Sequence, residues 1–438
     1  MAGNMRVLVL GSGAREHALA KRIARSPLVQ AVLCAPGNGG TAAFARNASV
    51  DPEDGAAVVA LARAHAIDFV VVGPEAPLVA GVVDALQAAG ILAFGPTRSG
   101  ARLEGSKSFS KEFMKRHAIP TAAAWSFDDA DAAIAHARAH GKPLVVKADG
   151  LAAGKGVVVA DSVEETVQAI ERVMRAREFG AAGARVLLEE RLFGQEVSYH
   201  VVLDGTRFVA LAPAQDHKRL LDGDRGPNTG GMGAYSPPPV VTPEVEAKIL
   251  ARVVQPTLAG LRADGIEYRG ALFIGLMICP SRSRAEARFD SEEPYVIEYN
   301  ARFGDPETQV LLARLAGDVL PLLLGSARGD LAGIEVRWDA PCALSVVVAA
   351  GGYPGAYRKG TPIRGLAAAA QLPDVEIFHA GTRLDGDVLV TAGGRVLSVT
   401  ASGADIDAAA ERAYAAAARI ELDGAQYRHD IGHHARKR

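Results

Sequence analysis

The sequence predicts a multidomain chain that combines the α/β and α+β classes. It contains an N-terminal doubly wound parallel sheet, a central unit of two lobes and a small strand-rich C-terminal domain. Three observations predict this division. Apolar runs alternate with Ala-rich helical stretches over the first hundred residues, this texture changes after Gly105, and strand-like segments dominate from about residue 335. A chain of 438 residues has room for two to four domains.

The N-terminal part has the rhythm of parallel strands joined by helical crossovers. Strands are expected at residues 6–10, 29–33, 69–72 and 92–94, and a helix near 15–24. The turn GSGAREH after the first strand is similar to a dinucleotide fingerprint, but Glu16 stands where the third glycine belongs, which disfavours an NAD site. The loop can still present backbone N–H groups and a helix N-terminus to a phosphate.

Two further loops of this part, PGNGG (36–40) and GPEAPL (73–78), also follow expected strands. The carboxyl ends of parallel strands lie at one edge of a sheet, where such sheets bind ligands. We therefore expect these loops to gather beside GSGAREH.

The remaining elements are expected in two groups. The central group has a helix at 107–117, strands near 144–148, 156–160, 185–190 and 196–203, and a helix near 163–176; then come a Gly/Pro-rich segment at 216–239, a helix at 243–264, a strand at 271–278, a charged insertion at 281–293 and a strand at 295–299. The C-terminal group has strands at 343–350, 376–380, 387–390 and 395–400 and a helix at 405–419. The expected domains are 1–104, 105–330 (with a small mobile lobe at about 122–195) and 331–438.

Composition excludes several classes of function. The 48 basic and 50 acidic residues give a formal net charge of −2, which supports neither a nucleic-acid groove nor an anionic-membrane surface. The three cysteines lie far apart in or beside apolar segments, as expected of thiols in a reducing compartment. A strand begins within a few residues of Met1, leaving no room for a signal peptide. We expect a soluble cytoplasmic protein.

The stretch KADGLAAGKGVVV (147–159) indicates a phosphate-binding loop of an unusual kind. It is not a Walker A loop, because three residues separate Gly150 from Gly154 and Gly156 replaces the hydroxyl residue after Lys155. Lys147 ends an apolar run, and a lysine at a buried strand end is costly unless it meets an anion. Two lysines around a glycine-rich turn therefore suggest nucleotide phosphate, and the loop is expected to close as a lid.

An acidic hinge follows in LLEERLFGQEVS, which holds Glu189, Glu190 and Glu196. Such a hinge can offer backbone groups to an adenine and a carboxylate to ribose hydroxyls, although taken alone it is more typical of a solvated turn.

The stretch VIEYNARFGDPE places Glu298 and Asn300 two apart on a strand, so both point to one face. Their oxygens suit Mg²⁺ between phosphates; by itself, Glu-x-Asn is also typical of a surface pair. Arg302 follows on the same face if the strand continues, and can neutralise phosphate charge.

The order lysine, lysine, glycine loop, acidic hinge, Glu-x-Asn, arginine resembles the ATP-grasp superfamily, in which two α+β lobes clamp ATP. The resemblance is closer to the glycinamide ribonucleotide synthetase family of purine synthesis. It is carried by GSGAREHAL, APGNGGTA, VVGPEAPLVAGVVDAL, FGPT, LEGSKSF, VVKADGLAAGKGVVVA, QDHKR, GPNTGGMGAYSP, IEYNARFGDPETQ, AAGGYPG and YRHDIG, which cover nearly the whole chain.

The resemblance implies that ATP phosphorylates the carboxylate of glycine and that 5-phosphoribosylamine then attacks the glycyl phosphate. It implies ATP contacts by Lys107, Lys147, Gly150, Gly154, Lys155 and Gly156, adenine contacts by Glu189, Glu190 and Leu192, and a ribose contact by Glu196. Glu298 and Asn300 would bind Mg²⁺ or Mn²⁺, and Lys147, Arg302 and Asp305 would act in catalysis.

The expected substrate contacts also come from the resemblance. Gly11, Gly13, Arg15, Asn38 and Gly39 would hold the sugar phosphate, with Glu75 on ribose hydroxyls; Asp216, Asn228, Thr229, Gly230, Gly231 and Met232 would line the glycine or amine pocket with Asp305. His17 is interpreted as a structural helix residue bonded to a carbonyl. The instability of phosphoribosylamine leaves open a transient contact with the enzyme that supplies it.

The sequence departs from the family pattern at several points. Many ATP-grasp enzymes carry a further acidic metal ligand on the strand before Glu298, but Gly275 stands near that position. The insertion at 281–293 lengthens the hairpin before Glu298, and Ser12 and Ala14 replace an expected Asn and Gly. The number of metals is therefore open.

Two rival functions remain at this level. A biotin-carboxylase-like ligase is disfavoured by GPNTGGMGAYSP and by the absence of a biotin-binding site. A nucleotide-sensing module without catalysis would keep the adenine hinge but could lose the metal ligands, whereas Glu298 and Asn300 are both present.

Overall fold

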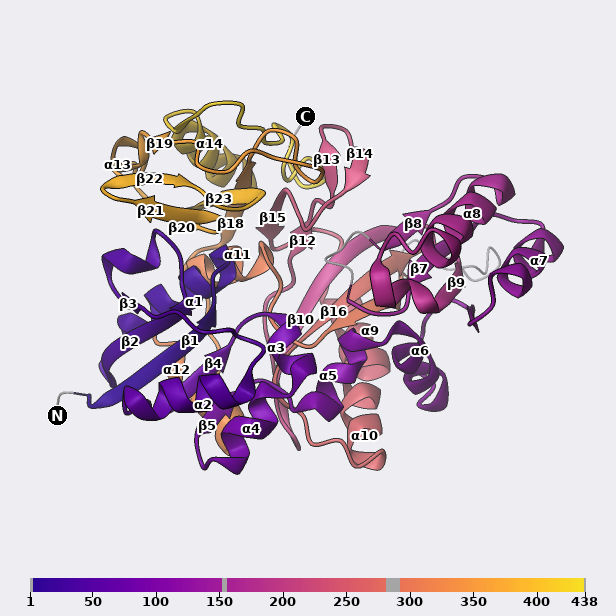
Figure 1. Ribbon diagram of the computed structural model, residues 1–438, viewed down its shortest axis with the longest axis horizontal. Coiled ribbons are helices and arrows are strands. Elements are labelled where there is room, and N and C mark those ends of the chain that lie inside the picture. Colours follow the sequence, from indigo (N-terminus) through magenta and orange to yellow (C-terminus); the bar gives the residue numbers. More distant parts are fainter. Residues whose placement is uncertain (1–2, 152–155, 281–291, 437–438) are drawn as a thin grey trace.

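The computed structural model describes residues 3–151, 156–280 and 292–436, and it is a mixed α/β chain of several packed sheets (Figure 1). The expected loop residues Gly154 and Lys155 and most of the 281–293 insertion lie outside these ranges. Within the described ranges, none of the helices is both long and apolar enough to cross a membrane.

The N-terminal sheet is parallel, as the sequence predicts, and its strand order is β3-β2-β1-β4-β5, in which the short edge strand β3 was not expected. Its strands are β1 (Met5–Gly11), β2 (Val29–Pro36), β3 (Arg46–Asn47), β4 (Phe69–Val72) and β5 (Leu92–Phe94). The helices are α1 (Ala14–Ala24), α2 (Gly55–Ala64), α3 (Glu75–Ala80), α4 (Val82–Ala88) and α5 (Arg98–Gly105). β1 and β4 are buried on both faces, which is typical of central parallel strands and explains their unbroken apolar runs.

The central part contains two sheets. The small lobe holds β6 (Ala124–Phe127), β7 (Leu144–Ala148), β8 (Val157–Val159) and β9 (Val186–Glu190) in the order β6-β9-β7-β8, with helices α7 (Ala130–His140) and α8 (Val163–Ile170). In Figure 1 this lobe projects away from the body. The larger sheet has the order β11-β10-β16-β17, from β10 (Gln195–Asp204), β11 (Phe208–Ala210), β16 (Arg269–Cys279) and β17 (Glu293–Asn300). The helices around it are α6 (Lys107–Arg116), α9 (Pro243–Ile249), α10 (Gln255–Ala263), α11 (Glu307–Arg314) and α12 (Leu320–Arg328).

The C-terminal sheet differs from the expectation in one respect. Its order is β12-β15-β18-β23-β20, so two of its strands, β12 (Gln215–Asp216) and β15 (Gly233–Ser236), come from the Gly/Pro-rich segment for which no strand was expected. The others are β18 (Cys342–Ala349), β20 (Val375–His379) and β23 (Arg395–Gly403), covered by α14 (Ile406–Ala417). β15 is a strand because it pairs with β18, more than a hundred residues later, and local composition carries no signal for such a partner.

Short elements complete the described chain. A hairpin of β13 (Arg219–Leu221) and β14 (Arg225–Asn228) also arises in the Gly/Pro-rich segment. Near the C-terminus lie β19 (Ile363–Arg364), α13 (Leu366–Ala369), β21 (Thr382–Asp385), β22 (Val388–Thr391) and β24 (Glu421–Leu422).

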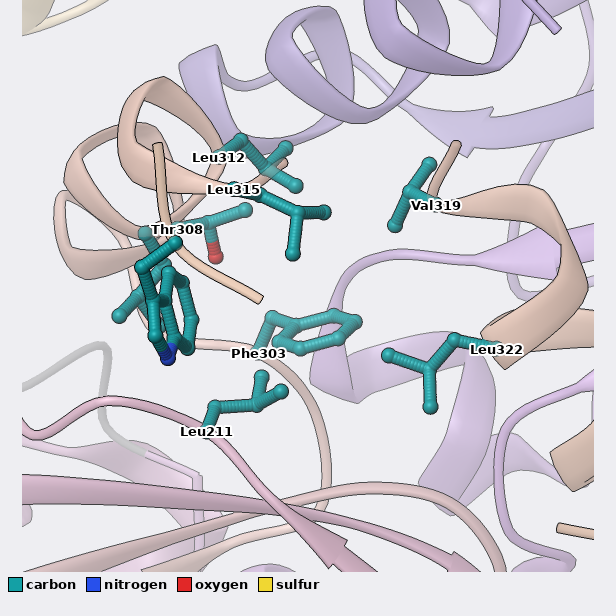
Figure 2. A pocket seen from close by; sticks show the side chains of 9 residues that line it. Leu211, Phe303, Thr308, Leu312, Leu315, Val319 and Leu322 are labelled. Atoms are coloured by element: carbon teal, nitrogen blue, oxygen red, sulfur yellow. The ribbon is translucent and has the colours of Figure 1, made fainter. Parts of the chain in front are cut away.

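One apolar core joins the N-terminal sheet to the rest of the chain. It contains Val7 and Leu19 of the N-terminal part, Leu323 of α12 and Phe378 of β20, all almost completely buried. Figure 2 shows a cavity of about 20 Å³ in this core, lined by apolar side chains around Phe303. A space of that size holds about one water molecule and has no charged lining group, so it is a packing defect rather than a substrate site.

His17 lies where α1 packs on β20. Its Nδ1 accepts the backbone N–H of His379 at 3.0 Å, and its ring contacts the rings of Phe44 and Phe378. The structural interpretation of His17 is therefore supported, although the bond goes to an amide and not to a carbonyl. Burial and the neighbouring His379 lower the pKa of His17 to about 3, and burial lowers that of His379 to about 4.

Acidification is therefore expected to loosen this contact. Above pH 6.5 His17 is neutral in both states; below it, the unfolded chain takes up a proton that the folded chain refuses until about pH 3. Stability is thus lost as the pH falls, by about 2 kcal/mol for His17 at pH 5. In urea unfolding at pH 7 and pH 5, His17→Asn should show a correspondingly smaller loss than the parent chain. His65→Asn, at a half-buried histidine, serves as the control; equal pH dependence in both variants would contradict the prediction.

Candidate active site

Lys147 connects the small lobe to the larger sheet. It extends from the end of β7, where its ammonium donates to the carbonyl oxygen of Ile297 on β17 at 2.9 Å. It also lies 3.0 Å from Glu189 Oε1, without hydrogen-bond geometry. Lys147, a predicted phosphate ligand, therefore contacts the backbone of the residue that precedes Glu298, the predicted metal ligand.

Glu189 does not face an open adenine pocket with its side chain. The carboxylate is buried between two ammonium groups, those of Lys147 and of Lys111, which lies 3.2 Å from Oε2. A buried carboxylate needs such cations to offset its lost hydration, so Glu189 positions the lysines. In the same hinge the backbone N–H of Glu190 already donates to Ala123 O, and Leu192 is half-buried.

Lys107 lies at the start of α6 beside the glycine loop. Its ammonium donates to the carbonyl oxygen of Gly150 at 2.8 Å, and burial lowers its pKa. The neighbouring Asp149 accepts the backbone N–H of Ser108, which fixes the loop against the helix N-terminus. At the far end of the loop, Gly156 O accepts the N–H of Ala148.

Glu298 and Asn300 lie on one face of β17, as predicted, opposite Gly275 and Phe273 of β16. Burial opposes the charge of Glu298, yet Lys218 and Lys147 lower its pKa to about 2, so the carboxylate is ionised. Gly275 offers no side chain, and a Cβ there would come within 2.9 Å of the Glu298 side chain.

Arg302 departs from its expected position on this strand. β17 ends at Asn300, and the guanidinium of Arg302 contacts Glu75 at 3.3 Å, Glu104 at 3.0 Å and Asn300 Oδ1 at 3.1 Å. Two carboxylates thus already compensate its charge. Glu75, expected on ribose hydroxyls, is one of them: burial opposes its charge, but Arg302, Arg15 and hydrogen bonds together lower its pKa. Burial raises the pKa of Glu104 to about 7.

Lys218 is a central residue that the sequence reasoning did not single out, although it lies in the quoted motif QDHKR. Its ammonium contacts Glu196 at 3.1 Å and Glu298 at 3.2 Å. Against the cost of burial, these carboxylates raise its pKa. Glu196, expected at the ribose, and Glu298, expected at the metal, are therefore held together by one cation.

Two further acids lie beside Lys218. Burial raises the pKa of Asp216 to about 8, since the charge of Lys218 only partly offsets the desolvation. Glu307, also missed, accepts the hydroxyl of Ser198 at 2.9 Å, and burial raises its pKa. The site therefore mixes ionised and protonated carboxyl groups at neutral pH.

The GPNTGGMG loop is bound at both ends. Thr229 donates its hydroxyl to Lys218 O at 2.9 Å, and Arg395 donates to the carbonyl oxygens of Gly230 and Gly231. Met232, expected in the glycine or amine pocket, has a fully buried side chain, and its backbone bonds to His217 and to Val347 of β18. Asn228 is half-buried and pairs with Arg219 in the β13–β14 hairpin.

The first glycine loop is filled by its own chain. The carboxylate of Glu16 accepts the backbone N–H of Gly13 at 2.7 Å and pairs with Arg15. Gly11 has φ +126°, and a Cβ there would lie 2.5 Å from Glu16 Cγ. The N–H of Gly13 expected to meet the sugar phosphate is thus occupied, because Glu16 caps α1 from the place of the missing third glycine.

Asn38 and Gly39 bind the chain itself. The Asn38 amide donates to Ser12 O and His379 O and accepts from the N–H groups of Gly40 and Thr41, which saturates it. The N–H of Gly39 donates to Thr382 O. This loop therefore docks on the C-terminal domain, and neither of these groups is available to a ligand.

Asp305 lies where three loops meet. A Cβ on Gly13 would come 3.2 Å from its carboxylate, Arg395 lies 3.5 Å from Oδ2, and Gln309 donates to Oδ1 at 2.7 Å. Burial opposes its charge, but Arg395 and Arg15 lower its pKa. The structure thus brings Gly13, the GPNTGGMG loop and Asp305 together, as expected.

Comparisons with known proteins agree over the whole chain. The models of the phosphoribosylglycinamide synthetase N domain, ATP-grasp (A) domain and C domain match residues 5–104, 105–308 and 343–434. The chain is 50% identical over 434 residues to phosphoribosylamine–glycine ligase of Ralstonia nicotianae, covering 99% of this chain and 100% of the relative. The same-named protein of Agrobacterium fabrum is 50% identical over 428 residues, with 98% of both chains covered.

Solved structures extend the comparison. The crystal structure of phosphoribosylamine–glycine ligase from Thermotoga maritima matches with a TM-score of 0.83 and 35% identity, covering 98% of this chain and 100% of the other. Biotin carboxylase from Campylobacter jejuni, solved as a β,γ-ATP complex, matches with a TM-score of 0.73 at 15% identity. The match covers 96% of this chain and 92% of the other, which shows a common fold.

The charge network around Lys218 makes a prediction about stability. Lys218→Met keeps the apolar stem but leaves Glu196 and Glu298 without their ammonium, which should cost about 1–3 kcal/mol of unfolding free energy at pH 7. The deficit should shrink as the pH falls from 4.5 towards 2, because Glu298 becomes protonated in both chains. Urea unfolding at a series of pH values measures both the deficit at pH 7 and its decrease with falling pH. Lys248→Met, which removes an ion pair with Glu293, is the matched control and should cost less than about 1 kcal/mol. Equal costs, or a pH-independent deficit, would contradict this assignment.

Proposed function

This chain belongs to the phosphoribosylglycinamide synthetase family, and we infer from that membership that it is the phosphoribosylamine–glycine ligase of purine biosynthesis. Its reaction joins glycine to phosphoribosylamine with ATP and yields glycinamide ribonucleotide, ADP and phosphate.

The observation that carries the site assignment is the contact between the lobes. Lys147 donates to the carbonyl oxygen next to Glu298, while Lys107 on α6 holds the glycine loop. These two lysines therefore face the Glu298 carboxylate from different elements, and the charges of both lower its pKa. We propose that the phosphates of ATP bind here, where they would replace loop and carboxylate contacts as partners of the lysines.

Glu298 and Asn300 fit a magnesium or manganese ion by their chemistry. Both offer hard oxygen atoms on one strand face, and Glu298 is ionised. Such an ion supplies charge neutralisation for phosphoryl transfer when it is bound. Lys218 already places a positive charge beside Glu298 and Glu196, so this region accepts cations.

The order of the reaction steps explains why several cations are needed. An oxygen of the glycine carboxylate attacks the γ-phosphorus of ATP, and ADP leaves, which turns a poor leaving group into phosphate. The amine of phosphoribosylamine then attacks the carbonyl carbon of glycyl phosphate, loses a proton and expels phosphate. Lys107 and Lys147 offset the charge of the transferred group.

We place the substrates between Asp305 and the GPNTGGMG loop. Asp305 is ionised and lies beside Gly13 and Gly231, so it can accept hydrogen bonds from an ammonium or an attacking amine. Arg302 acts less directly than the sequence suggests: paired with Glu75 and Glu104, it stabilises the base of the site. Glu189 likewise positions Lys111 and Lys147 for the nucleotide.

We propose a cytoplasmic location, which the unbridged thiols of Cys34 and Cys342 and the purine pathway support. The expected domain limits of 1–104, 105–330 and 331–438 remain proposals, as does a transient contact with the enzyme that supplies phosphoribosylamine.

The activity is tested by phosphate release from ATP with glycine and freshly prepared phosphoribosylamine, each omitted in turn. We expect stoichiometric phosphate and glycinamide ribonucleotide only when all three are present. Nucleotide binding without any turnover would instead favour the sensing module, and turnover that ignores phosphoribosylamine would contradict the assigned acceptor.

Glu298→Gln is the sharpest test of the metal assignment. It keeps the shape but removes the negative charge, so the chain should fold while turnover falls roughly 150-fold, equivalent to about 3 kcal/mol of barrier. Melting temperature and turnover are measured together. Glu293→Gln, at the opposite end of β17, is the matched control and should keep its turnover. Near-normal turnover of Glu298→Gln at saturating Mg²⁺ would remove this residue from the metal site.

A further inference from the structure

The C-terminal turn places two imidazoles against the tip of the β13–β14 hairpin. His433 Nε2 lies 3.3 Å and His434 Nε2 lies 3.7 Å from the same oxygen, Oδ2 of Asp224. One ligand atom from each of the three residues lies within 4.8 Å of the others. Asp224 and His434 are about two-fifths exposed and His433 one-third, so the cluster is open to solvent.

The Asp224 carboxylate is held with one oxygen directed at these imidazoles. Its other oxygen, Oδ1, accepts from the buried guanidinium of Arg428 at 2.8 Å. His217 Nε2 accepts the N–H of Gly432, so the proton of a neutral His217 is on Nδ1, which lies 3.8 Å from Oδ1. The nearby N–H of His217 and the hydrogen bond from Arg428 lower the pKa of Asp224. Its charge and orientation are thus set by residues outside the cluster.

The tautomer of His433 leaves a lone pair facing an anion. Its Nδ1 lies 3.1 Å from the carbonyl oxygen of Asp430, which can only accept, so Nδ1 carries a proton. In neutral His433 the Nε2 lone pair then faces Asp224 Oδ2. Two acceptors at this separation repel unless a cation lies between them.

We propose that Asp224, His433 and His434 form a binding site for a divalent transition metal of the zinc class, distinct from the Glu298–Asn300 site. In a tetrahedral zinc site with bonds of about 2.0–2.1 Å, ligand atoms are about 3.3–3.4 Å apart, close to the 3.3 and 3.7 Å between Asp224 Oδ2 and the two imidazoles. Imidazole nitrogen selects zinc, nickel or copper over magnesium. The Asp430 carbonyl bound to His433 and the Arg428 and His217 groups bound to Asp224 are outer partners of the kind that orient metal ligands.

Such an ion would join two distant segments. Asp224 lies at the tip of a hairpin that starts directly after Lys218 and ends at Asn228, while His433 and His434 belong to the C-terminal turn. The metal would therefore cross-link the β13–β14 hairpin, which leads into the GPNTGGMG loop, to the C-terminal turn. This inference does not depend on the proposed ligase activity.

The test uses the untagged full-length chain, stripped of metal by a chelator and kept in excess Mg²⁺ to compete at oxygen-rich sites. Zn²⁺ is titrated calorimetrically and Co²⁺ by its visible absorption. We expect one zinc ion per chain, a tetrahedral Co²⁺ spectrum and a melting temperature that rises with Zn²⁺. His434→Gln and Asp224→Asn should each weaken Zn²⁺ binding at least about tenfold.

His429→Gln is the matched control, because this exposed histidine pairs with Asp222 near the cluster but lies outside it. It should keep the affinity of the parent chain. The melting temperature of each variant without metal shows whether weaker binding comes from unfolding or from loss of a metal ligand. If Asp224→Asn folds poorly, His434→Gln still tests the site, because it leaves the contact between Arg428 and Asp224 intact. Absence of Zn²⁺ binding in excess Mg²⁺, or equal affinity in all variants, would overturn the proposal.

Discussion

The ammonium of Lys147 links two sheets that share no strand. It leaves β7 in the small lobe, pairs with Glu189 and donates to Ile297 O on β17, and an amine buried in this way is stable only while such partners surround it. The position of the small lobe and the composition of the site are therefore coupled. A change in the partners of this ammonium group would therefore alter the contact between the lobes.

The rest of the site follows the same rule of compensating buried charge. Lys218 holds Glu196 and Glu298, Arg302 holds Glu75 and Glu104, and Arg395 holds Asp305. These cations lower the pKa of Glu75, Glu298 and Asp305, whereas burial raises the pKa of Glu104 to about 7 and that of Asp216 to about 8. Ionised and protonated carboxyl groups therefore lie close together, and the charge of each depends on how far neighbouring cations offset its lost hydration.

The C-terminal domain supports loops of the other two parts of the chain. Arg395 binds the carbonyl groups of Gly230 and Gly231, and Asn38 of the N-terminal sheet bonds to His379 O. Loops of the N-terminal and central parts therefore rest on strands from the end of the chain. This arrangement makes the C-terminal domain part of the positioning of the site.

Local pattern determined much of this protein. Buried parallel strands such as Phe69–Val72 are unbroken apolar runs, and the alternation of side chains along a strand was enough to place Glu298 and Asn300 on one face. The partners of charged groups were decided only by tertiary structure. Glu189 meets lysines, Lys218 bridges two distant acids and β15 pairs with β18, because each of these contacts depends on which segments, scores of residues apart, fold into reach. Periodicity reports which face of an element is buried; it carries no information about which charge lies opposite.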